Sequence, residues 1–283
     1  MNSRRSSNEL PIDSSAEVGA LRQSSQKSKF GEFSRKYASS NEALKYDQAM
    51  EAHQNLLITK LETDFIIRMS KRLLTSSSAS YLDVATGTGR IIAGIEKESS
   101  MVMGLDPSRA MIKLATKNTR YASFVVGDGS NIPFRDSSFE LITCFRLLIN
   151  LAREQRFKFL SECRRVLTRN GLLIADLHAN KMSPTGIAGT IRTRLGWSKA
   201  RDFGRYDLLT RPRMAREMQT AGLMPCGVLS TYLPTIFKFL RGRNSHVMTL
   251  ADMRISQMFG MFADVIVMAA LKQGPRDHSE MSA

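Results

Sequence analysis

Short apolar runs alternate with segments of helical periodicity through the middle of the chain. The runs that we predict as strands cover residues 81–85, 101–105, 123–126, 139–145 and 172–177. Between them, apolar residues recur three and four positions apart, which is typical of helices that cover a sheet. Because the runs are almost continuously apolar, both faces of each strand are expected to be buried. This pattern predicts an α/β fold with a Rossmann-like, doubly wound and mostly parallel sheet.

Different patterns flank this central part. Residues 41–74 carry apolar side chains four positions apart, which predicts a helical layer before the sheet. The helix after the fourth predicted strand is expected to end at Asn170-Gly171, because glycine commonly follows a helix end. The predicted organisation is a disordered tail (1–30), an N-terminal helical layer (31–75), the core (76–177), a substrate lid with the sixth strand (178–262), an antiparallel final strand (263–272) and a frayed end (273–283).

The sequence YLDVATGTGR at residues 81–90 carries the first candidate site. An apolar strand ends there in a turn that contains Gly87 and Gly89, and an amphipathic helix begins directly afterwards. Glycine permits a left-handed bend and lets a ligand approach the backbone. Asp83 is expected where the strand frays into the turn, free to anchor a cation or an amine. Taken alone, such a turn also fits a purely structural role.

Acidic residues are expected at the ends of three consecutive strands, namely Asp83, Asp106 and Asp128. In an open parallel sheet, the carboxyl ends of the strands form the ligand-binding edge. A carboxylate after the second strand suits ribose hydroxyls, and Asp128, which stands between two glycines, suits the edge of an adenine. One such acid is explained by helix capping, whereas three at one edge favour a nucleoside site. The GxGxxG pattern of dinucleotide sites is absent, because Ile92 stands at its third glycine position.

At these residues the chain resembles the class I S-adenosylmethionine-dependent methyltransferases, especially their quinone-biosynthesis-like or methyltransferase-11-like branch. The matching segments are DVATGTGR (83–90), GLDPSRAMIKLA (104–115), VVGDGSNIPFRDSSFELITCF (125–145) and RVLTRNGLLIADL (165–177). The resemblance is good from residue 81 to residue 177 and looser as far as residue 271. It implies S-adenosyl-L-methionine as the cofactor and methyl transfer as the activity.

The resemblance also implies a role for each cofactor-binding residue. Asp83 and the backbone of Gly87 and Gly89 are expected to hold the methionine end of the cofactor. Asp106 is expected to accept hydrogen bonds from the ribose hydroxyls. The remaining residues that it implies are Asp128 at the adenine amine, Gly129 beside it, and Phe145 facing the cofactor.

The sequence departs from the family pattern in two places. Ala85 stands where the family more often has glycine, and a methyl group there is expected to be tolerated. Residues 146–150 (RLLIN) lack the acid and the two histidines that many relatives carry. The second departure leaves the methyl acceptor open, including whether the accepting atom is oxygen, carbon or nitrogen.

Methyl transfer from a sulfonium mainly requires an aligned nucleophile and the exclusion of water. A general base contributes only where the acceptor must lose a proton. His178, directly after the fifth predicted strand, is the candidate catalytic residue, followed by Tyr46 in the helical layer. His246 lies farther along, in a polar loop. Each histidine also suits a hydrogen-bonded structural or surface position.

Charge adds a question about partners. The 283 residues carry a formal net charge of +15, which favours nucleic acid, an anionic membrane surface or an acidic acceptor and also fits a solvated surface. Between Thr190 and Arg216, eight basic residues stand against two acidic ones. No RNA-binding module or alternation of aromatic and basic residues is visible, which disfavours nucleic acid.

Cysteine spacing and hydropathy disfavour two further classes of protein, those with a cysteine-bound metal and those that span a membrane. The three cysteines, Cys144, Cys163 and Cys226, show no metal-binding spacing, so no metal is expected. No uninterrupted apolar run approaches the ~18 residues of a spanning helix. We therefore expect a cytoplasmic protein that reaches a membrane, if at all, only at its surface; the sequence leaves its oligomeric state open.

These observations predict an enzyme, an S-adenosylmethionine-dependent methyltransferase that acts on a small-molecule or lipid-like acceptor. Two alternatives stay open. The basic charge motivates an RNA or protein methyltransferase. A non-catalytic cofactor-binding partner subunit is the other, because a site that binds the cofactor need not transfer the methyl group.

Overall fold

The computed structural model describes residues 39–76, 79–178, 180–195, 209–232, 256 and 258–273. Every structural statement below concerns this part of the chain. The predicted N-terminal tail, most of the predicted frayed end, parts of the predicted lid and His246 lie outside the described residues.

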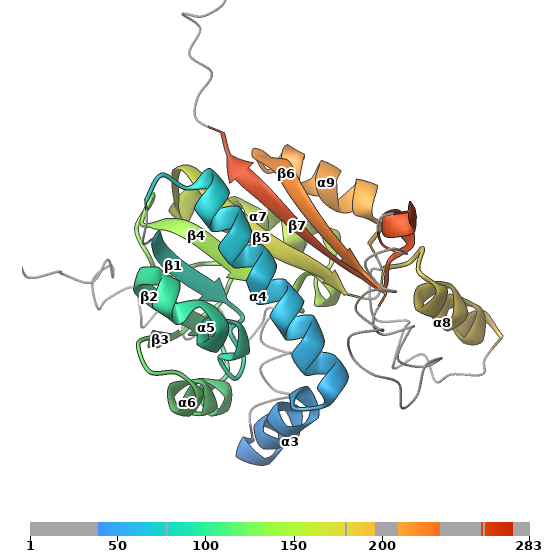
Figure 1. Cartoon of the computed structure of the whole chain (residues 1–283), viewed down its shortest axis with the longest axis horizontal. Coiled ribbons are helices and arrows are strands. Elements are labelled where there is room, and N and C mark those ends of the chain that lie inside the picture. The colour runs from blue at the N-terminus through green and yellow to red at the C-terminus, as the bar shows by residue number, and fades with distance from the viewer. Residues whose placement is uncertain are drawn as a thin grey trace, which may run out of the picture.

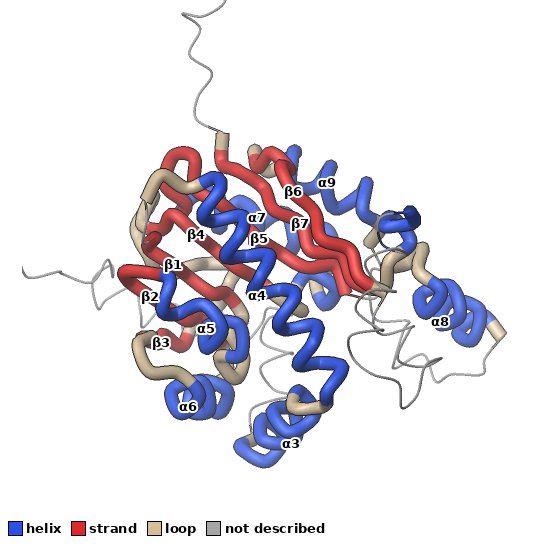
Figure 2. The backbone as a smooth tube through the Cα atoms, in the orientation of Figure 1, coloured by secondary structure: helices blue, strands red, loops and turns tan. Residues whose placement is uncertain are grey.

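Seven strands form one sheet in the order β3-β2-β1-β4-β5-β7-β6 (Figures 1 and 2). They are β1 (Ala79–Val84), β2 (Ser99–Asp106), β3 (Ser123–Val126), β4 (Phe139–Cys144), β5 (Leu167–His178), β6 (Leu223–Thr231) and β7 (Val265–Lys272). The first five strands pair in parallel, and β7 runs antiparallel to both β5 and β6. The predicted Rossmann-like sheet with an antiparallel final strand is confirmed. Its strand order reverses between β1 and β4, which is where open α/β sheets bind ligands.

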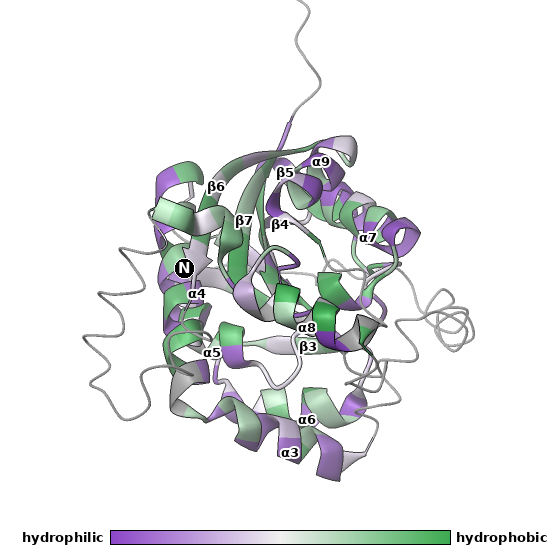
Figure 3. Ribbon diagram, turned by 90° about the vertical axis from the view of Figure 1, so that its right-hand side faces the viewer, coloured by the Kyte–Doolittle hydropathy of each residue, from purple (hydrophilic) through white to green (hydrophobic). Residues whose placement is uncertain are grey.

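Helices cover both faces of the sheet. The described helices are α3 (Ser40–Met50), α4 (His53–Leu73), α5 (Arg90–Ile95), α6 (Arg109–Asn118), α7 (Arg153–Val166), α8 (Pro184–Arg194) and α9 (Arg211–Thr220), with short 3-10 turns η1 (Glu96–Glu98), η2 (Leu148–Asn150) and η3 (Gly260–Phe262). Apolar residues of α4 and α5 pack on one face of the sheet, and those of α7 and α9 pack on the other. In Figure 3, strand β7 is green over most of its length between these layers, whereas α3 and α6 carry purple patches.

Local sequence accounts for several element boundaries. Ser108 caps α6, since its hydroxyl accepts a hydrogen bond from the Met111 amide at 3.2 Å. The strand predicted at residues 123–126 coincides with β3. Both boundaries depend only on neighbours within a few residues, so the sequence suffices to place them.

The predicted helical layer consists of two helices, because Ala52, with a ψ of 136°, interrupts the helical path between α3 and α4. One predicted helix boundary is wrong. The helix after β4 ends at Val166, and Asn170 lies within β5 with a φ of 62°. Leu167 already pairs with Phe139, so the strand begins there, and the Asn170 bend is absorbed as an irregularity in the β4–β5 register.

The chain after the fifth predicted strand also differs from expectation. His178 was expected just beyond that strand, but it is the last residue of β5 and pairs with Val265 of β7. Helix α8 was not predicted, because its apolar residues are exposed and the segment shows only weak periodicity. Figure 1 shows α8 at the side of the molecule, away from the face that α4 covers.

Candidate functional site

The turn between β1 and α5 forms the floor of the candidate site. Gly87 and Gly89 have φ values of 56° and 79°, in the left-handed region that favours glycine. A Cβ at Gly89 would lie 3.1 Å from Ala115 of α6, whereas a Cβ at Gly87 would meet no atom within 4 Å. Gly89 therefore allows close helix packing, and Gly87 leaves open space beside the turn.

Ala85 adopts the same left-handed conformation, with a φ of 59°. An L-residue in this region costs about 1–2 kcal/mol. The structure therefore gives a physical reason why glycine suits this position, and it shows that alanine is accommodated at the cost of local strain.

Asp83 is buried in β1 rather than free at a frayed strand end, which corrects the sequence-based expectation. Its side chain is 2% exposed. One carboxylate oxygen accepts a hydrogen bond from the Thr86 hydroxyl at 2.8 Å, and the other accepts from the Thr143 hydroxyl of β4 at 2.6 Å. Burial raises the pKa of Asp83 from 3.8 to about 7, against the opposing effect of these two hydrogen bonds.

We predict that Asp83→Asn makes the stability of the protein less sensitive to pH. The unfolded chain loses the Asp83 proton near pH 3.8, whereas the folded protein keeps it until about pH 7. This carboxyl group therefore lowers the free energy of unfolding as the pH rises through that window, and asparagine removes the effect. Between about pH 5 and about pH 8, urea unfolding should show the variant gaining about 2–3 kcal/mol relative to the wild type.

The exposed residue Asp64 provides a matched control for that experiment, because Asp64→Asn removes a carboxylate that is paired only with Lys60 at the surface. Its stability should follow the wild type across the same pH range within about 0.5 kcal/mol. A difference between Asp83→Asn and the wild type that stays constant with pH would contradict the prediction.

Asp106 ends β2 and joins it to the glycine turn. One of its oxygens accepts a hydrogen bond from the Gly87 amide at 2.9 Å, and the other accepts from the Ser108 amide at 2.8 Å. Burial raises the pKa of Asp106 to about 6, although both amides favour the ionised form. The carboxylate thus holds the turn in place while it keeps further lone pairs for a ligand.

Asp128 and Gly129 follow β3 at the same edge of the sheet. Asp128 accepts a hydrogen bond from the Ser130 amide at 2.8 Å and forms an isolated bridge with Asn131. The three acids therefore lie at or directly beyond the carboxyl ends of β1, β2 and β3, which are neighbours in the sheet. Two of them also bind backbone amides two residues ahead, so each has a structural contact as well as a place at the edge.

Phe145 lies directly after β4 and is 7% exposed. It borders a cavity of about 30 Å³ beside the glycine turn. The other residues that line this cavity are Tyr46, Asp83, Ala85, Thr86, Gly87, Thr88, Arg90, Ile91 and Arg146. The fold thus brings Phe145, Asp83 and Gly87 to one cavity.

The remaining candidates for proton transfer have different surroundings. The backbone of His178 lies at the end of β5, on the carboxyl edge of the parallel strands. Burial raises the pKa of Tyr46 above its ordinary value of 10.0, which disfavours its ionisation and hence a role as a base. His178 stays the predicted catalytic residue.

Several polar residues near the cavity were missed by sequence reasoning. Glu62 of α4 is 1% exposed and pairs with Arg90 at 3.1 Å. Thr143 links Asp83 to the hydroxyl of Tyr81, which lies 2.7 Å from it. Two features of the sequence could have indicated these residues. Glu62 is an acidic residue beside the apolar stripe of α4, and Thr143 is a polar residue inside the apolar run of β4.

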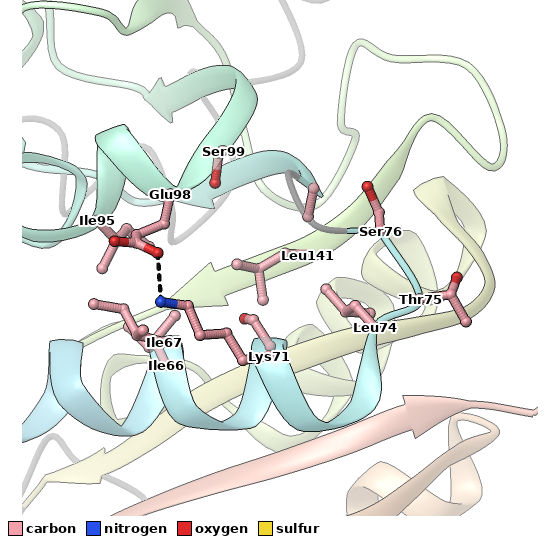
Figure 4. Close-up of a pocket in the computed structure, with 12 residues that line it drawn as sticks. Ile66, Ile67, Lys71, Leu74, Thr75, Ser76, Ile95, Glu98, Ser99 and Leu141 are labelled. Carbon is pink, nitrogen blue, oxygen red and sulfur yellow. Dashed lines mark ion pairs between the residues drawn. The ribbon is translucent and has the colours of Figure 1, made fainter.

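A second cavity, of about 310 Å³, lies at the opposite end of the strands (Figure 4). It is bordered by the last turns of α4 and the starts of β1 and β2, and the ion pair between Lys71 and Glu98 crosses it at 2.9 Å. None of the predicted site residues lines it. Although this second cavity is the larger of the two, it is separate from the glycine turn.

Two negative findings apply to the described residues. They contain no group of three or more His, Cys, Asp or Glu side chains arranged to hold a metal ion. None of the helices described is long and apolar enough to cross a membrane.

Comparison with known proteins identifies the domain. Residues 82–175 match the model of a methyltransferase domain family. Demethylmenaquinone methyltransferase of Thermotoga maritima is 35% identical over 116 residues, which are 40% of this chain and 50% of the relative. The chain thus spans about half the length of this curated relative.

Solved structures share the fold at low sequence identity. Magnesium protoporphyrin IX methyltransferase from Synechocystis superposes with a TM-score of 0.60 at 12% identity, covering 87% of this chain and 100% of that one. A protein described as a cyclase superposes with a TM-score of 0.52 at 14% identity, covering 77% and 82%. The fold is therefore shared by proteins with different activities. The family match shows that residues 82–175 of this chain are a methyltransferase domain.

Proposed function

We propose that this protein transfers a methyl group from S-adenosylmethionine to a small-molecule acceptor. The observation that carries the proposal is the gathering of Asp83, Asp106 and Asp128 at one sheet edge beside the glycine turn. All three lie within the segment that matches a methyltransferase domain. The named activities of the relatives support a small-molecule acceptor, since they concern a quinone and a porphyrin.

The cofactor-binding residues have distinct proposed roles. Asp106 accepts from the ribose hydroxyls, and Asp128 with Gly129 meets the adenine. Asp83 and the turn at Gly87 and Gly89 hold the methionine end. The cavity of about 30 Å³ is bordered by Asp83 and Gly87, two of the residues proposed for the methionine end.

The proposed mechanism is catalysis by alignment. The bound cofactor supplies an activated methyl group. The protein orients the acceptor in line with that group and keeps water out, since a near-attack geometry alone supplies a large part of the rate. Buried apolar side chains such as Phe145 and Ile91 keep this edge of the sheet dry. Where the acceptor is a hydroxyl, His178 takes its proton.

A finer part of the proposal is that the acceptor is lipid-like and is reached at an anionic membrane surface. Helix α8 and the residue after it expose Ile187, Ile191 and Leu195, each about half accessible and spaced one helical turn apart. Arg192 on the same helix is also exposed. An apolar stripe beside an exposed arginine suits an interfacial helix, and the net charge of +15 points the same way.

The role of Asp106 is tested by Asp106→Asn. The amide keeps the shape of the side chain but loses charge-assisted hydrogen bonds worth about 1.5–3 kcal/mol. Calorimetry with S-adenosylhomocysteine should therefore show affinity lower by about 10–100-fold. The surface variant Asp64→Asn should bind like the wild type. Unchanged affinity in Asp106→Asn would remove this residue from the ribose site.

Methyl transfer itself is tested by incubating the protein with labelled S-adenosylmethionine and fractionated extract. Label in small molecules or lipids is the expected result. Label in RNA or protein would replace the proposed acceptor class. Cofactor binding without label in any fraction would favour a non-catalytic subunit.

A further inference from the structure

Arg146 occupies the first position after Phe145, at the carboxyl end of β4. Its backbone is left-handed, with a φ of 59°. The conformation is held on both sides, because the Arg146 amide donates to the Asp176 carboxylate at 2.6 Å and its carbonyl accepts from the Asn150 side chain at 2.7 Å. Such a conformation is costly for an arginine and persists where its surroundings determine it. The turn therefore sets where this side chain leaves the backbone.

The Arg146 side chain lines the cavity beside the glycine turn, together with Gly87 and Asp83. It is 18% exposed, and its Nη2 atom lies 3.9 Å from the Glu62 carboxylate, an ion pair without a hydrogen bond. This Nη2 atom is buried and has no hydrogen-bond partner among the described residues. The Tyr46 side chain is hydrogen-bonded to the Arg146 side chain.

Arg90 makes a useful contrast, because it lines the same cavity. Its guanidinium donates to the Glu62 carboxylate at 3.1 Å and to the Thr59 hydroxyl. Of the described residues around this cavity, only Arg90 and Arg146 are cationic. Arg90 thus donates its hydrogen bonds to residues of α4, whereas the Nη2 atom of Arg146 can still donate to a ligand.

A buried guanidinium donor without a partner is costly, so a ligand that supplies an acceptor gains from meeting it. The fork of donors in arginine matches a carboxylate, which accepts two parallel hydrogen bonds. The methionine end of S-adenosylmethionine carries such a carboxylate, and under the proposed function that end lies against Asp83 and Gly87.

We propose that Arg146 binds the carboxylate of the methionine moiety of the cofactor. The inference rests on the proposed function, since it names a contact within that cofactor site. Glu62 holds the guanidinium loosely at the edge of the cavity until the cofactor carboxylate replaces this long ion pair with direct hydrogen bonds. Arg146 thereby selects cofactors that have an intact amino-acid end.

The test compares two ligands that differ in that end. S-adenosylhomocysteine carries the carboxylate, whereas 5′-methylthioadenosine has the same nucleoside without it. In calorimetry, Arg146→Gln should weaken binding of S-adenosylhomocysteine by about 10–100-fold and change the affinity for 5′-methylthioadenosine by less than about 3-fold. Arg146→Lys should recover part of the loss, and the exposed Arg72→Gln should bind both ligands like the wild type.

A third ligand separates the carboxylate from the neighbouring amine. Decarboxylated S-adenosylmethionine keeps the amine, so its affinity should be the same for the wild type and Arg146→Gln. Thermal melting of each variant reports whether it is folded, and Arg146→Lys preserves the charge if the glutamine variant is not.

The outcomes distinguish this inference from the function on which it rests. If the wild type binds neither S-adenosylhomocysteine nor 5′-methylthioadenosine, the proposed function fails and the inference fails with it. If Arg146→Gln weakens both ligands equally, the residue only shapes the turn and the inference alone is wrong. Unchanged cofactor affinity with a raised KM for an anionic acceptor would assign Arg146 to the acceptor instead.

Discussion

A protein with alanine in place of His178 is expected to transfer methyl groups about 10²–10⁴-fold more slowly, provided that the acceptor is a hydroxyl that must lose a proton. His178 ends β5 at the carboxyl edge of the parallel strands, the edge that also carries Asp83 and Asp106. A base positioned there removes the proton as the oxygen attacks the methyl group. The measurement is kcat with the natural acceptor, once the labelling experiment has identified its class.

Two further readouts separate a base from a structural residue. The affinity for S-adenosylhomocysteine should stay within about 3-fold of the wild type, because the proposed cofactor contacts come from other strands. In the wild type, kcat should rise with pH across the neutral range, and this rise should vanish in the variant. A variant that keeps both its rate and its pH profile would exclude the base role and leave alignment to explain the reaction.

Replacement of Arg156 by methionine is expected to lower the free energy of unfolding by about 3–5 kcal/mol. Arg156 of α7 is fully buried, and its guanidinium makes two hydrogen bonds to the Glu217 carboxylate of α9, at 2.7 and 3.0 Å. A third hydrogen bond goes to the carbonyl of Leu151, just after η2. Methionine fills the space but leaves the Leu151 carbonyl without this donor, and it leaves the largely buried Glu217 carboxylate with the hydrogen bond from Arg213 at 3.1 Å. Urea unfolding at neutral pH measures the loss.

Two variants show whether the loss comes from the Glu217 carboxylate that loses its Arg156 partner. The double variant Arg156→Met/Glu217→Met should regain most of the stability, because replacing a whole buried ion pair with apolar groups is often neutral. Arg153 provides the control on the same helix, since Arg153→Met changes an exposed residue and should cost less than about 0.5 kcal/mol. A single variant at Arg156 that loses less than about 1 kcal/mol would show that the ion pair contributes little.

Local pattern alone predicted the order of the elements and the edge at which the acids meet. The run at residues 123–126 forms β3. Four residues bounded by turn signals are too few for a stable helix, so the sequence favours a short strand there. Asp106 and Asp128 lie where parallel strands end, and parallel strands in one sheet end at one edge. The glycine turn was recognisable because Gly87 and Gly89 are needed for their left-handed backbone.

Long-range pairing overruled the local pattern at one helix end. Asn170 and Gly171 are typical of a helix end, yet Leu167 pairs with Phe139, so that β5 begins before they are reached. The local pattern also left open where the helical layer at residues 41–74 is interrupted: the break lies at Ala52, and α3 packs on α6 whereas α4 packs on the sheet. A strand partner or a packing surface from elsewhere in the chain is not contained in the local sequence.

The sequence by itself determined the fold class, the glycine turn and the row of three acids, because these follow from periodicity and residue type. Only the tertiary structure decided how deeply each of these side chains is buried, what it is hydrogen-bonded to and how its pKa is shifted. Thr143, sixty positions away, stands beside Asp83 and binds its carboxylate, and burial raises the pKa of that group to about 7. Glu62 and Arg146 meet across 84 positions because α4 covers the end of β4. Burial and hydrogen bonding arise from such contacts between distant segments, so a pattern of neighbours along the chain cannot specify them.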